Sequence, residues 1–248
     1  MVRKLKFYGW GHEGEGLDED ERSRVFRFAA EKLGAEPKPA APPQVSDIKL
    51  RAPRISAPAS LASVLTQDPH ERLLHTYGKS YPETVRAFAR DFANAPDYVA
   101  LPETEADIAA VFGWANGAKV AVIPFGAGSS VVGGVEPVVG DGYTGAVSLD
   151  MRRLNRVLEV DPVSRAARIQ AGIRGPAIEA ALKPHDFALR HYPQSFEFST
   201  LGGWIATRSG GHFATLYTHI DDLVESLRTV TPAGVIVRRL STRSSICV

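Results

Sequence analysis

The stretch VAVIPFGAGSS, residues 120–130, joins an apolar run to a loop of glycine and serine. The valine and isoleucine residues of 120–123 predict a buried strand. Small residues after a strand let the backbone approach a ligand closely, and backbone amides arranged in this way commonly surround a phosphate. An ordinary surface turn has the same composition, so the loop alone leaves a phosphate site and a plain turn open.

Two common phosphate loops do not match this stretch. A nucleotide triphosphate loop requires a lysine beside its last glycine, and Ser129 follows Gly128 instead. A Rossmann fingerprint requires the spacing GxGxxG at the start of a helix, and the next glycines come late, at Gly133 and Gly134. The remaining phosphate interpretation is a tight loop that holds a pyrophosphate through its amides and serine hydroxyls, without a lysine.

A second stretch, QSFEFSTLGGWIATRSGG at residues 194–211, has the same character. It combines hydroxyl side chains with two pairs of glycines. Small residues allow a large planar ligand to lie against the backbone, and hydroxyls can bond its polar edges. Two such stretches in one domain indicate a dinucleotide that is held along its length.

The expected secondary structure mixes helices and strands irregularly, which predicts an α+β fold. Residues 98–123 form a β-α-β unit, in which Thr104 caps a helix that runs to about Gly117, with Asp107 at the capping-box position. A hairpin is expected around Thr231-Pro232-Ala233-Gly234. The other predicted elements are a helix over 176–182 and strands over 146–149, 156–160, 166–171, 224–230 and 235–239.

The first 95 residues are predicted to form a helical arm that leads to the domain. A helix is expected over 18–33, with Val25, Phe28, Ala29 and Leu33 on one face and Gly34 at its end. The proline-rich residues 35–44 are predicted to form an extended connector, and residues 60–96 to be mostly helical with an interruption near Tyr77-Gly78-Lys79. The expected division is an arm over 1–95 and a domain over 96–240, with an atypical tail at 241–248.

Composition and charge exclude several classes of function. The chain of 248 residues has a formal net charge of +1, so no overall field favours nucleic acid or an anionic membrane. No stretch approaches the length of a membrane span. The single cysteine, Cys247, excludes an internal disulfide, and His185, His191, His212 and His219 lack metal-site spacing. We therefore expect no metal site and treat these histidines as surface or turn residues.

Several motifs in a fixed order resemble a known family. IPFGAGSSVVGG, SLDMRRLNRVLEVD, AGIRGPAIEAAL, FSTLGGWIATRSGG and HIDDLVESLRTVTPAG follow one another along the chain. Their order and content resemble the p-cresol-methylhydroxylase-type FAD-binding domain of the vanillyl-alcohol-oxidase superfamily, which has two α+β subdomains. Within it, FYGWG at residues 7–11 and Trp204 in LGGWIATR favour the alkyldihydroxyacetonephosphate synthase family over the lactate and glycolate dehydrogenases.

The resemblance implies three segments that contact FAD. The first holds the pyrophosphate, and there Ala127 replaces the middle one of three glycines; the second begins with Gln194 where the family usually has an acid. Arg208, in the third, could neutralise phosphate or form a surface ion pair. The implied cofactor residues are Pro124, Phe125, Gly126, Ala127, Gly128, Ser129 and Ser130, then Gln194, Ser195, Phe196, Glu197, Phe198, Ser199 and Thr200, then Thr207, Arg208, Ser209 and Gly210.

The resemblance also implies a reaction, in which the acyl chain of an acyl-dihydroxyacetone phosphate is exchanged for a fatty alcohol. FAD is expected to be non-covalent, because no histidine lies between Lys119 and Leu149. The family's catalytic groups belong to a C-terminal cap domain that is expected to be missing after Arg239, so no catalytic residue is assigned and the chain is expected to be a fragment with little activity.

Two alternatives stay open beside this function. One is an FAD-dependent oxidase or dehydrogenase of a small hydroxy acid or alcohol, and the other is a non-catalytic remnant that binds FAD. The expected partners are a small-molecule or lipid substrate and a second copy in a homodimer, with no nucleic acid. The expected location is the cytoplasm, since no peroxisomal Ser-Lys-Leu address ends the chain.

Overall fold

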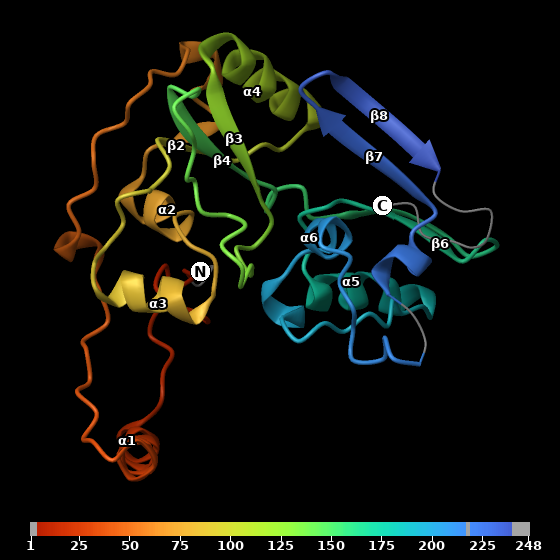
Figure 1. Cartoon of the computed structure of the whole chain (residues 1–248). Coiled ribbons are helices and arrows are strands. Elements are labelled where there is room, and N and C mark those ends of the chain that lie inside the picture. The colour runs from red at the N-terminus through yellow and green to blue at the C-terminus, as the bar shows by residue number, and fades with distance from the viewer. Residues whose placement is uncertain (1–3, 217–218, 240–248) are drawn as a thin grey trace.

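A computed structural model describes residues 4–216 and 219–239 (Figure 1). These residues form two lobes, one on each side of the loop that follows strand β3. The first lobe, residues 4–156, contains a four-stranded sheet, and the second lobe, residues 157–239, contains two two-stranded sheets. Both lobes combine helices with strands, so the predicted α+β fold is confirmed.

The sheet of the first lobe has the order β1-β2-β4-β3. Strand β4 lies between β2 and β3 and is parallel to both, while β1 is antiparallel to β2. The β-α-β unit predicted from the sequence is present, but the later strand β4 separates its two strands. The strands are β1 (Leu65–Thr66), β2 (Tyr98–Ala100), β3 (Val120–Phe125) and β4 (Gly145–Asp150).

Helix α4 (Glu105–Ala118) connects β2 to β3 and packs against the sheet. The expected capping box is formed, because Thr104 and Asp107 each accept a hydrogen bond from the other's backbone amide. Its buried residues Ile108 and Val111 join Val147 and Leu149 of β4 in one core. This packing fixes the carboxyl ends of β3 and β4, from which the candidate site begins.

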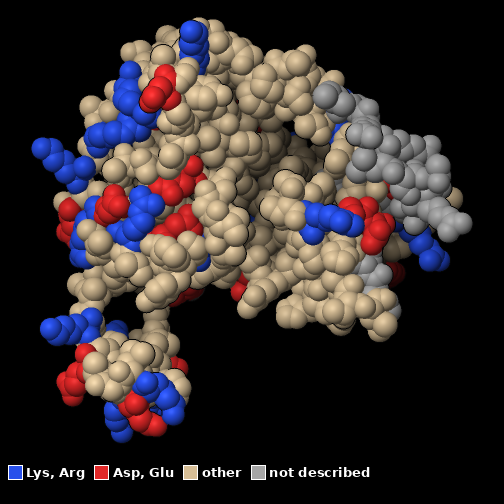
Figure 2. All heavy atoms as spheres, viewed as in Figure 1, with Lys and Arg blue, Asp and Glu red and all other residues tan. Residues whose placement is uncertain are grey.

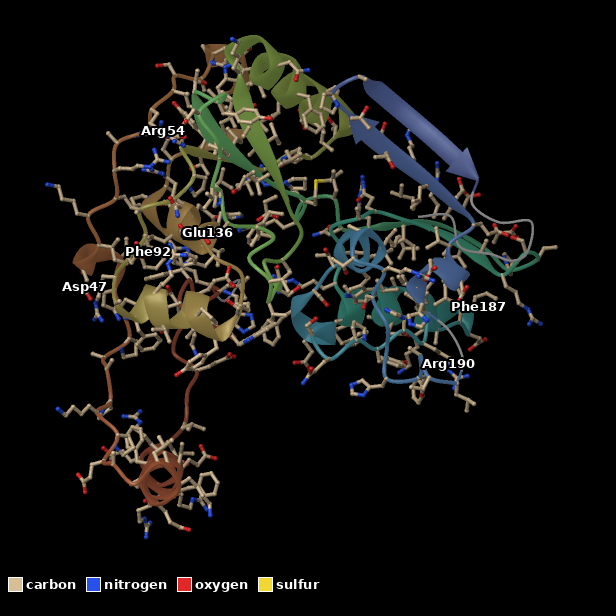
Figure 3. The ribbon with its side chains drawn as sticks, in the orientation of Figure 1. Asp47, Arg54, Phe92, Glu136, Phe187 and Arg190 are labelled. Atoms are coloured by element: carbon tan, nitrogen blue, oxygen red, sulfur yellow. The ribbon has the colours of Figure 1, made fainter. Side chains whose placement is uncertain are left out.

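The second lobe has its own core, formed around α5 (Gly175–Leu182) and α6 (Leu201–Ala206). Ile178, Leu201 and Trp204 are almost fully buried in it, and Phe187, labelled in Figure 3, packs against them. The strands are β5 (Val157–Asp161) with β6 (Ala166–Ile169), and β7 (Ser226–Thr231) with β8 (Gly234–Arg239). The hairpin expected near residue 232 is therefore present.

Residues 60–96 contain much less helix than the sequence predicts. They hold α2 (Pro69–Leu74), α3 (Tyr81–Phe88), one 3-10 turn at Ala59–Leu61 and the short strand β1. The expected interruption near residues 77–79 is present, between α2 and α3. The expectation of a mostly helical segment is wrong, because Leu65 and Thr66 pair with β2 in a long-range contact that overrides local preference, and because residues 89–97 are turn and irregular structure.

Helix α1 (Glu19–Leu33) is the expected helix, with Asp18 as its N-cap and Gly34 in a left-handed C-cap. It extends away from the rest of the first lobe in Figure 1 and buries none of its residues. The apolar side chains Val25, Phe28 and Leu33 are 49%, 61% and 74% exposed. The amphipathic pattern thus predicts the helix correctly, but its apolar face has no packing partner among the described residues.

The expected tail at 241–248, including Cys247, lies outside the described residues. Within the described ranges, no helix is long and apolar enough to cross a membrane.

Candidate cofactor site

The loop after β3 lies between the two lobes and follows the buried Phe125, the last residue of the strand. Gly126 faces Thr200 of the second lobe so closely that a Cβ atom would lie 2.3 Å from the threonine Oγ1. Gly128 has a φ of +69°, and a Cβ there would lie 2.5 Å from the ring of Phe125. Both glycines are therefore required by the structure, and two of the three predicted segments meet at Gly126.

The amides of this loop are available to a ligand. Within the described residues, none of the backbone N–H groups of 126–130 donates a hydrogen bond to another protein atom. The Ser130 hydroxyl works inside the loop, where it accepts bonds from the amides of Val132 and Gly134 at 3.4 and 3.0 Å. Successive amides without a protein acceptor, next to a glycine in the left-handed region, are typical of loops that bind an anion.

Ala127 does not strain this loop. It is not among the residues with positive φ, and the left-handed position falls one residue later, on Gly128. The alanine in place of the family's middle glycine is therefore accommodated, and its small side chain lines a cavity between the lobes.

The second segment, 194–200, ends at the N-terminus of α6. Thr200 caps that helix by accepting a bond from the amide of Gly203, and it is 2% exposed. The hydroxyl of Ser199 accepts a 2.6 Å bond from Trp204 Nε1 and donates to the carbonyl of Ser195. These two hydrogen bonds of Ser199 hold residues 195–200 against the buried Trp204. Phe196 stacks on Trp204, whereas Gln194 and Glu197 are exposed.

The third segment, Thr207 to Gly210, follows α6 at the surface. The Thr207 hydroxyl donates to the carbonyl of Gly203 at 2.9 Å. Arg208 forms an ion pair of 2.8 Å with Asp221, and the two side chains are 74% and 41% exposed. Of the two interpretations of Arg208, the structure contains the surface ion pair. Ser209 donates to the Gly210 carbonyl, and Gly210 forms an isolated bridge with His219.

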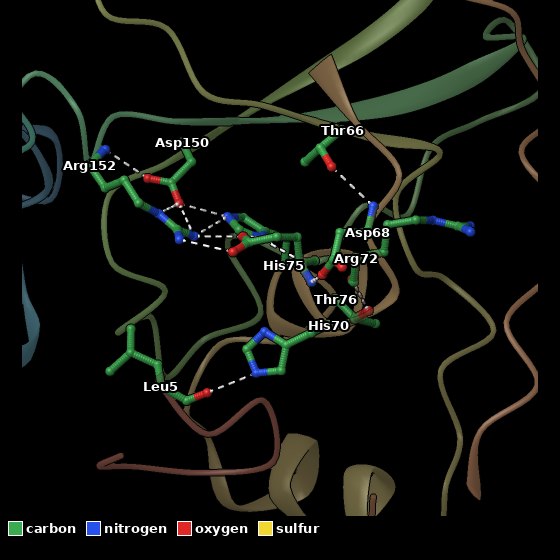
Figure 4. Close-up of polar contacts among 10 residues, drawn as sticks. Leu5, Thr66, Asp68, His70, Arg72, His75, Thr76, Asp150 and Arg152 are labelled. Carbon is green, nitrogen blue, oxygen red and sulfur yellow. Dashed lines mark hydrogen bonds and ion pairs between the residues drawn. The ribbon is translucent and has the colours of Figure 1, made fainter. Parts of the chain in front are cut away.

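A buried polar cluster that the sequence analysis did not find lies at the end of β4 (Figure 4). His75 Nε2 is 2.8 Å from Asp150 Oδ2, and Arg152 Nε donates to the same oxygen at 2.6 Å. Arg152 also bonds both carboxylate oxygens of Glu71. Burial raises the pKa of Asp150, but the bonds from His75 and Arg152 outweigh it and hold this pKa below its usual value. The ring of His75 packs on Phe125 at 4.1 Å, so the cluster supports the start of the loop.

The N-terminal residues reach the same place. Phe7 is buried against Phe92, which Figure 3 labels in the first lobe, while Trp10 packs edge-on against Phe198 of the second segment. FYGWG is thus anchored in the first lobe and contacts the second, so it forms part of the site's wall. Its aromatic and glycine content was a signal for this role, but its contacts are set by tertiary structure.

One expectation about the histidines is wrong. His191 is not a surface residue: it is 2% exposed, and its ring packs against Trp204 at 5.2 Å. Burial, followed by the charge of His219, lowers the pKa of His191, so it is neutral. Its Nε2 atom has no hydrogen-bond partner in the described structure. Hydrophobic periodicity does not predict the burial of His191, because the residue lies in a segment without helix or strand.

These residues fit an FAD molecule. Figure 2 shows a hollow between the lobes, and the loop with the free amides lies between the lobes in Figure 1. The donor set consists of backbone amides and hydroxyls, which suits a diphosphate. In the ranges that the structure describes, no group of three or more histidine, cysteine, aspartate or glutamate side chains could hold a metal ion.

An α+β fold in which the loop amides between two lobes have no acceptor among the described residues suits a dinucleotide, whose diphosphate the amides could bind. The chain belongs to the FAD-binding domain family, because the model of that family, described as "FAD binding domain", matches residues 96–239. This match confirms FAD as the cofactor and the p-cresol-methylhydroxylase-type fold that the motifs predicted.

Named relatives place the chain more narrowly. An alkyldihydroxyacetonephosphate synthase of Dictyostelium discoideum is 44% identical over 74% of this chain and 30% of its own length. A solved alkyldihydroxyacetonephosphate synthase structure matches 95% of this chain and 49% of its own, with a TM-score of 0.81 and 34% identity. An FAD-linked oxidoreductase of Escherichia coli, described as uncharacterized, is 34% identical over 56% of this chain and 28% of its own length. The expected resemblance and the class of FAD-dependent enzymes are confirmed, and the chain spans half or less of each of these relatives.

Proposed function

We propose that the protein exchanges the acyl chain of an acyl-dihydroxyacetone phosphate for a fatty alcohol, and that this chain supplies its FAD-binding part. The observation that carries the proposal is the extent of similarity. The sequence match to an alkyldihydroxyacetonephosphate synthase of Trypanosoma brucei brucei covers 97% of the chain, whereas the sequence matches to FAD-linked oxidoreductases cover 56% to 64%. Trp10 and Lys79, which come before residue 96, lie at the loop, so the larger coverage bears on the site itself.

In the proposed reaction, the oxygen of the fatty alcohol replaces the acyl-bearing oxygen, and the fatty acid leaves. There is no net oxidation or reduction. FAD would supply the reactive ring that makes this substitution feasible. The residues of this chain act before that step, by binding the cofactor. The amides of 126–130 bind the diphosphate. Thr200 holds the second lobe in contact with Gly126, and the hydrogen bonds of Ser199 hold the segment that carries Thr200 in place.

The proposed cofactor contacts are the three segments that the sequence singled out. The free amides support the first of them, and the contact between Gly126 and Thr200 supports the second. The exposed ion pair of Arg208 favours a structural role for that residue over a phosphate contact. The division at residue 96, the homodimer and the cytoplasmic location stay predictions.

The test is product analysis with acyl-dihydroxyacetone phosphate, a labelled fatty alcohol and FAD. It is applied to the 248-residue chain and to the longest product of its gene. We expect label in an ether product without reduction of an added electron acceptor, and little turnover by the 248-residue chain alone. Acceptor reduction by a hydroxy acid, without ether formation, would instead support the oxidase or dehydrogenase alternative, which FAD-linked relatives also favour. FAD binding with neither reaction would support the non-catalytic remnant.

A further inference from the structure

Two cations lie at the loop after β3 and come from different lobes. Lys79 follows α2, and Arg174 directly precedes α5. Both line one small cavity together with Ala127, Trp10 and Phe198, and Lys6 of the N-terminal segment lines it as well. Neither Lys79 nor Arg174 makes an ion pair with a carboxylate within the part of the chain that the structure describes. Cations gathered at a glycine loop without a carboxylate are typical of an anion site.

Lys79 is fixed to the loop by its own backbone. Its amide donates to the carbonyl of Ser130, the last residue of the loop, at 2.6 Å. Its Nζ atom has one long hydrogen bond, 3.4 Å to the carbonyl of Lys6. Burial lowers the pKa of Lys79 to about 8, against the opposing charge of Glu83. A partly buried ammonium group with only one long hydrogen bond destabilises the folded state, unless a ligand places negative charge beside it.

Arg174 is fixed to the opposite segment. Its backbone forms an antiparallel bridge with Thr200, the residue whose hydroxyl faces Gly126. Burial lowers the pKa of its guanidinium, Asp150 raises it and Arg152 lowers it. An arginine stays charged in proteins at neutral pH, so Arg174 brings a positive charge to the cavity.

The nearest carboxylates are already engaged elsewhere. Asp150 is bonded by Arg152 and His75, and Glu71 is bonded by Arg152. Glu83 accepts bonds from the amides of Gly78 and Ser80. These carboxylates therefore have partners that are better placed than Lys79 or Arg174, which leaves the two cations for a ligand.

We propose that Lys79 and Arg174 form a two-cation clamp for the diphosphate of FAD, acting from the two lobes at Ala127. The inference rests on the proposed role of the loop in binding the cofactor. The cavity that the two side chains line has a volume of about 10 Å³, which is room for one oxygen-sized group. It therefore suits a phosphate oxygen, while the open hollow between the lobes is left for the rest of the dinucleotide.

The clamp is tested by titrating FAD and riboflavin into the wild-type chain, Lys79→Met, Arg174→Met and the double variant, followed by flavin fluorescence. Each single variant should weaken FAD binding about 10-fold and the double variant about 100-fold, because bonds to charged groups are the strong ones. Riboflavin has no phosphate, so its affinity should change by less than about 2-fold. Lys49→Met and Arg27→Met, which remove exposed cations far from the cavity lining, serve as matched controls and should change neither affinity.

The outcomes separate the clamp from the rest of the site. Unchanged FAD affinity in the double variant overturns the clamp, and so does an equal loss for FAD and riboflavin, which would show a structural defect. A wild-type chain that binds neither flavin overturns the FAD site and the clamp together. Clamp-dependent FAD binding in a full-length protein that forms no ether product supports the clamp and overturns only the proposed reaction.

Discussion

Gly126 and Gly128 are the two residues at which the loop is most sensitive to substitution. Gly126→Ala places a methyl group 2.3 Å from Thr200 Oγ1, and Gly128→Ala combines a clash on Phe125 with a positive φ. We expect each to lower the free energy of unfolding by about 2–4 kcal/mol and to weaken FAD binding. Thermal unfolding and FAD titration measure both effects.

Ala127→Gly is the control for these glycine substitutions. Ala127 does not have a positive φ, so replacing it with glycine relieves no backbone strain in the folded state. The only effect is a larger conformational entropy of the unfolded chain. The expected cost is about 0.4–1 kcal/mol, with FAD affinity preserved. A gain in stability from this change would contradict the backbone assignment.

Lys79 gives a prediction with a defined pH dependence. Its folded pKa, about 8, is below its usual value of 10.5, so the folded state disfavours the charged form. At pH 7 the amine is protonated in both states and the folded state carries the full penalty, which is relieved as pH rises from about 8 to 10.5. Lys79→Met should therefore be more stable than the wild type at pH 7, by about 1–3 kcal/mol, with the difference shrinking at higher pH.

Urea unfolding of both proteins between pH 7 and pH 10.5 measures this difference. Lys49→Met, at an exposed site, should follow the wild type throughout. A Lys79→Met variant that is less stable at pH 7 would show that the ammonium group stabilises the apo fold, contrary to the structure.

Among the elements, α2 is joined to the end of β4 by the cluster of His75, Asp150, Arg152 and Glu71. Asp150→Ala would leave a buried histidine and an arginine without their shared carboxylate. We expect a loss of about 3–5 kcal/mol in the free energy of unfolding, because breaking a buried charge cluster costs more than the bonds it contained. Asp150 has a lowered pKa, so its contribution should be lost as pH falls below about 4.

Chemical unfolding of Asp150→Ala at pH 7 and at pH 3 tests this, with Glu31→Gln on the exposed part of α1 as the control. The difference from the wild type should be large at pH 7 and smaller at pH 3. A difference that does not depend on pH would show that lost packing, and not charge, causes the effect.

Helix α1 shows how a correct local pattern can have no packing role within the lobes. Its caps and periodicity define the helix, but it buries nothing. Phe28→Ser should change the free energy of unfolding by less than about 0.5 kcal/mol, since the side chain is 61% exposed. Phe92→Ala, in the core of the first lobe, should cost about 3–5 kcal/mol. Thermal unfolding compares the two, and a large loss in Phe28→Ser would reveal a partner for α1, such as a second copy of the chain.

For the whole molecule, ligand binding between the lobes should couple their stability. FAD at 100 times its dissociation constant adds about 2.7 kcal/mol to the free energy of unfolding of the state that binds it. Because Gly126 and Thr200 belong to different lobes and meet at the site, FAD should raise the unfolding midpoint of both. Calorimetry with and without FAD measures this, and a shift of one lobe's transition alone would show that the ligand contacts only that lobe.

The sequence by itself determined the features that depend on neighbouring residues. The capping box of α4, the strand expected to end at Ile123, the glycine loop after it and the hairpin at 231–234 all follow from local preferences and spacing, although β3 continues to Phe125 in the structure. The order of the motifs also determined the family, because a motif can be recognised in the sequence without knowledge of its contacts in the folded protein. The segments that were assigned wrongly, 60–96 and His191, are those whose structure depends on distant partners.

Only the tertiary structure decided which of these parts come together. It placed β4 between β2 and β3, brought Thr200 to Gly126, and gathered Lys79, Arg174 and Trp10 at Ala127. The physical reason is that such contacts join segments far apart in the chain. Their geometry is set by how the apolar faces of two cores pack, and no local pattern encodes that packing. The loop could be predicted from the sequence, but the positively charged side chains that lie beside it could not.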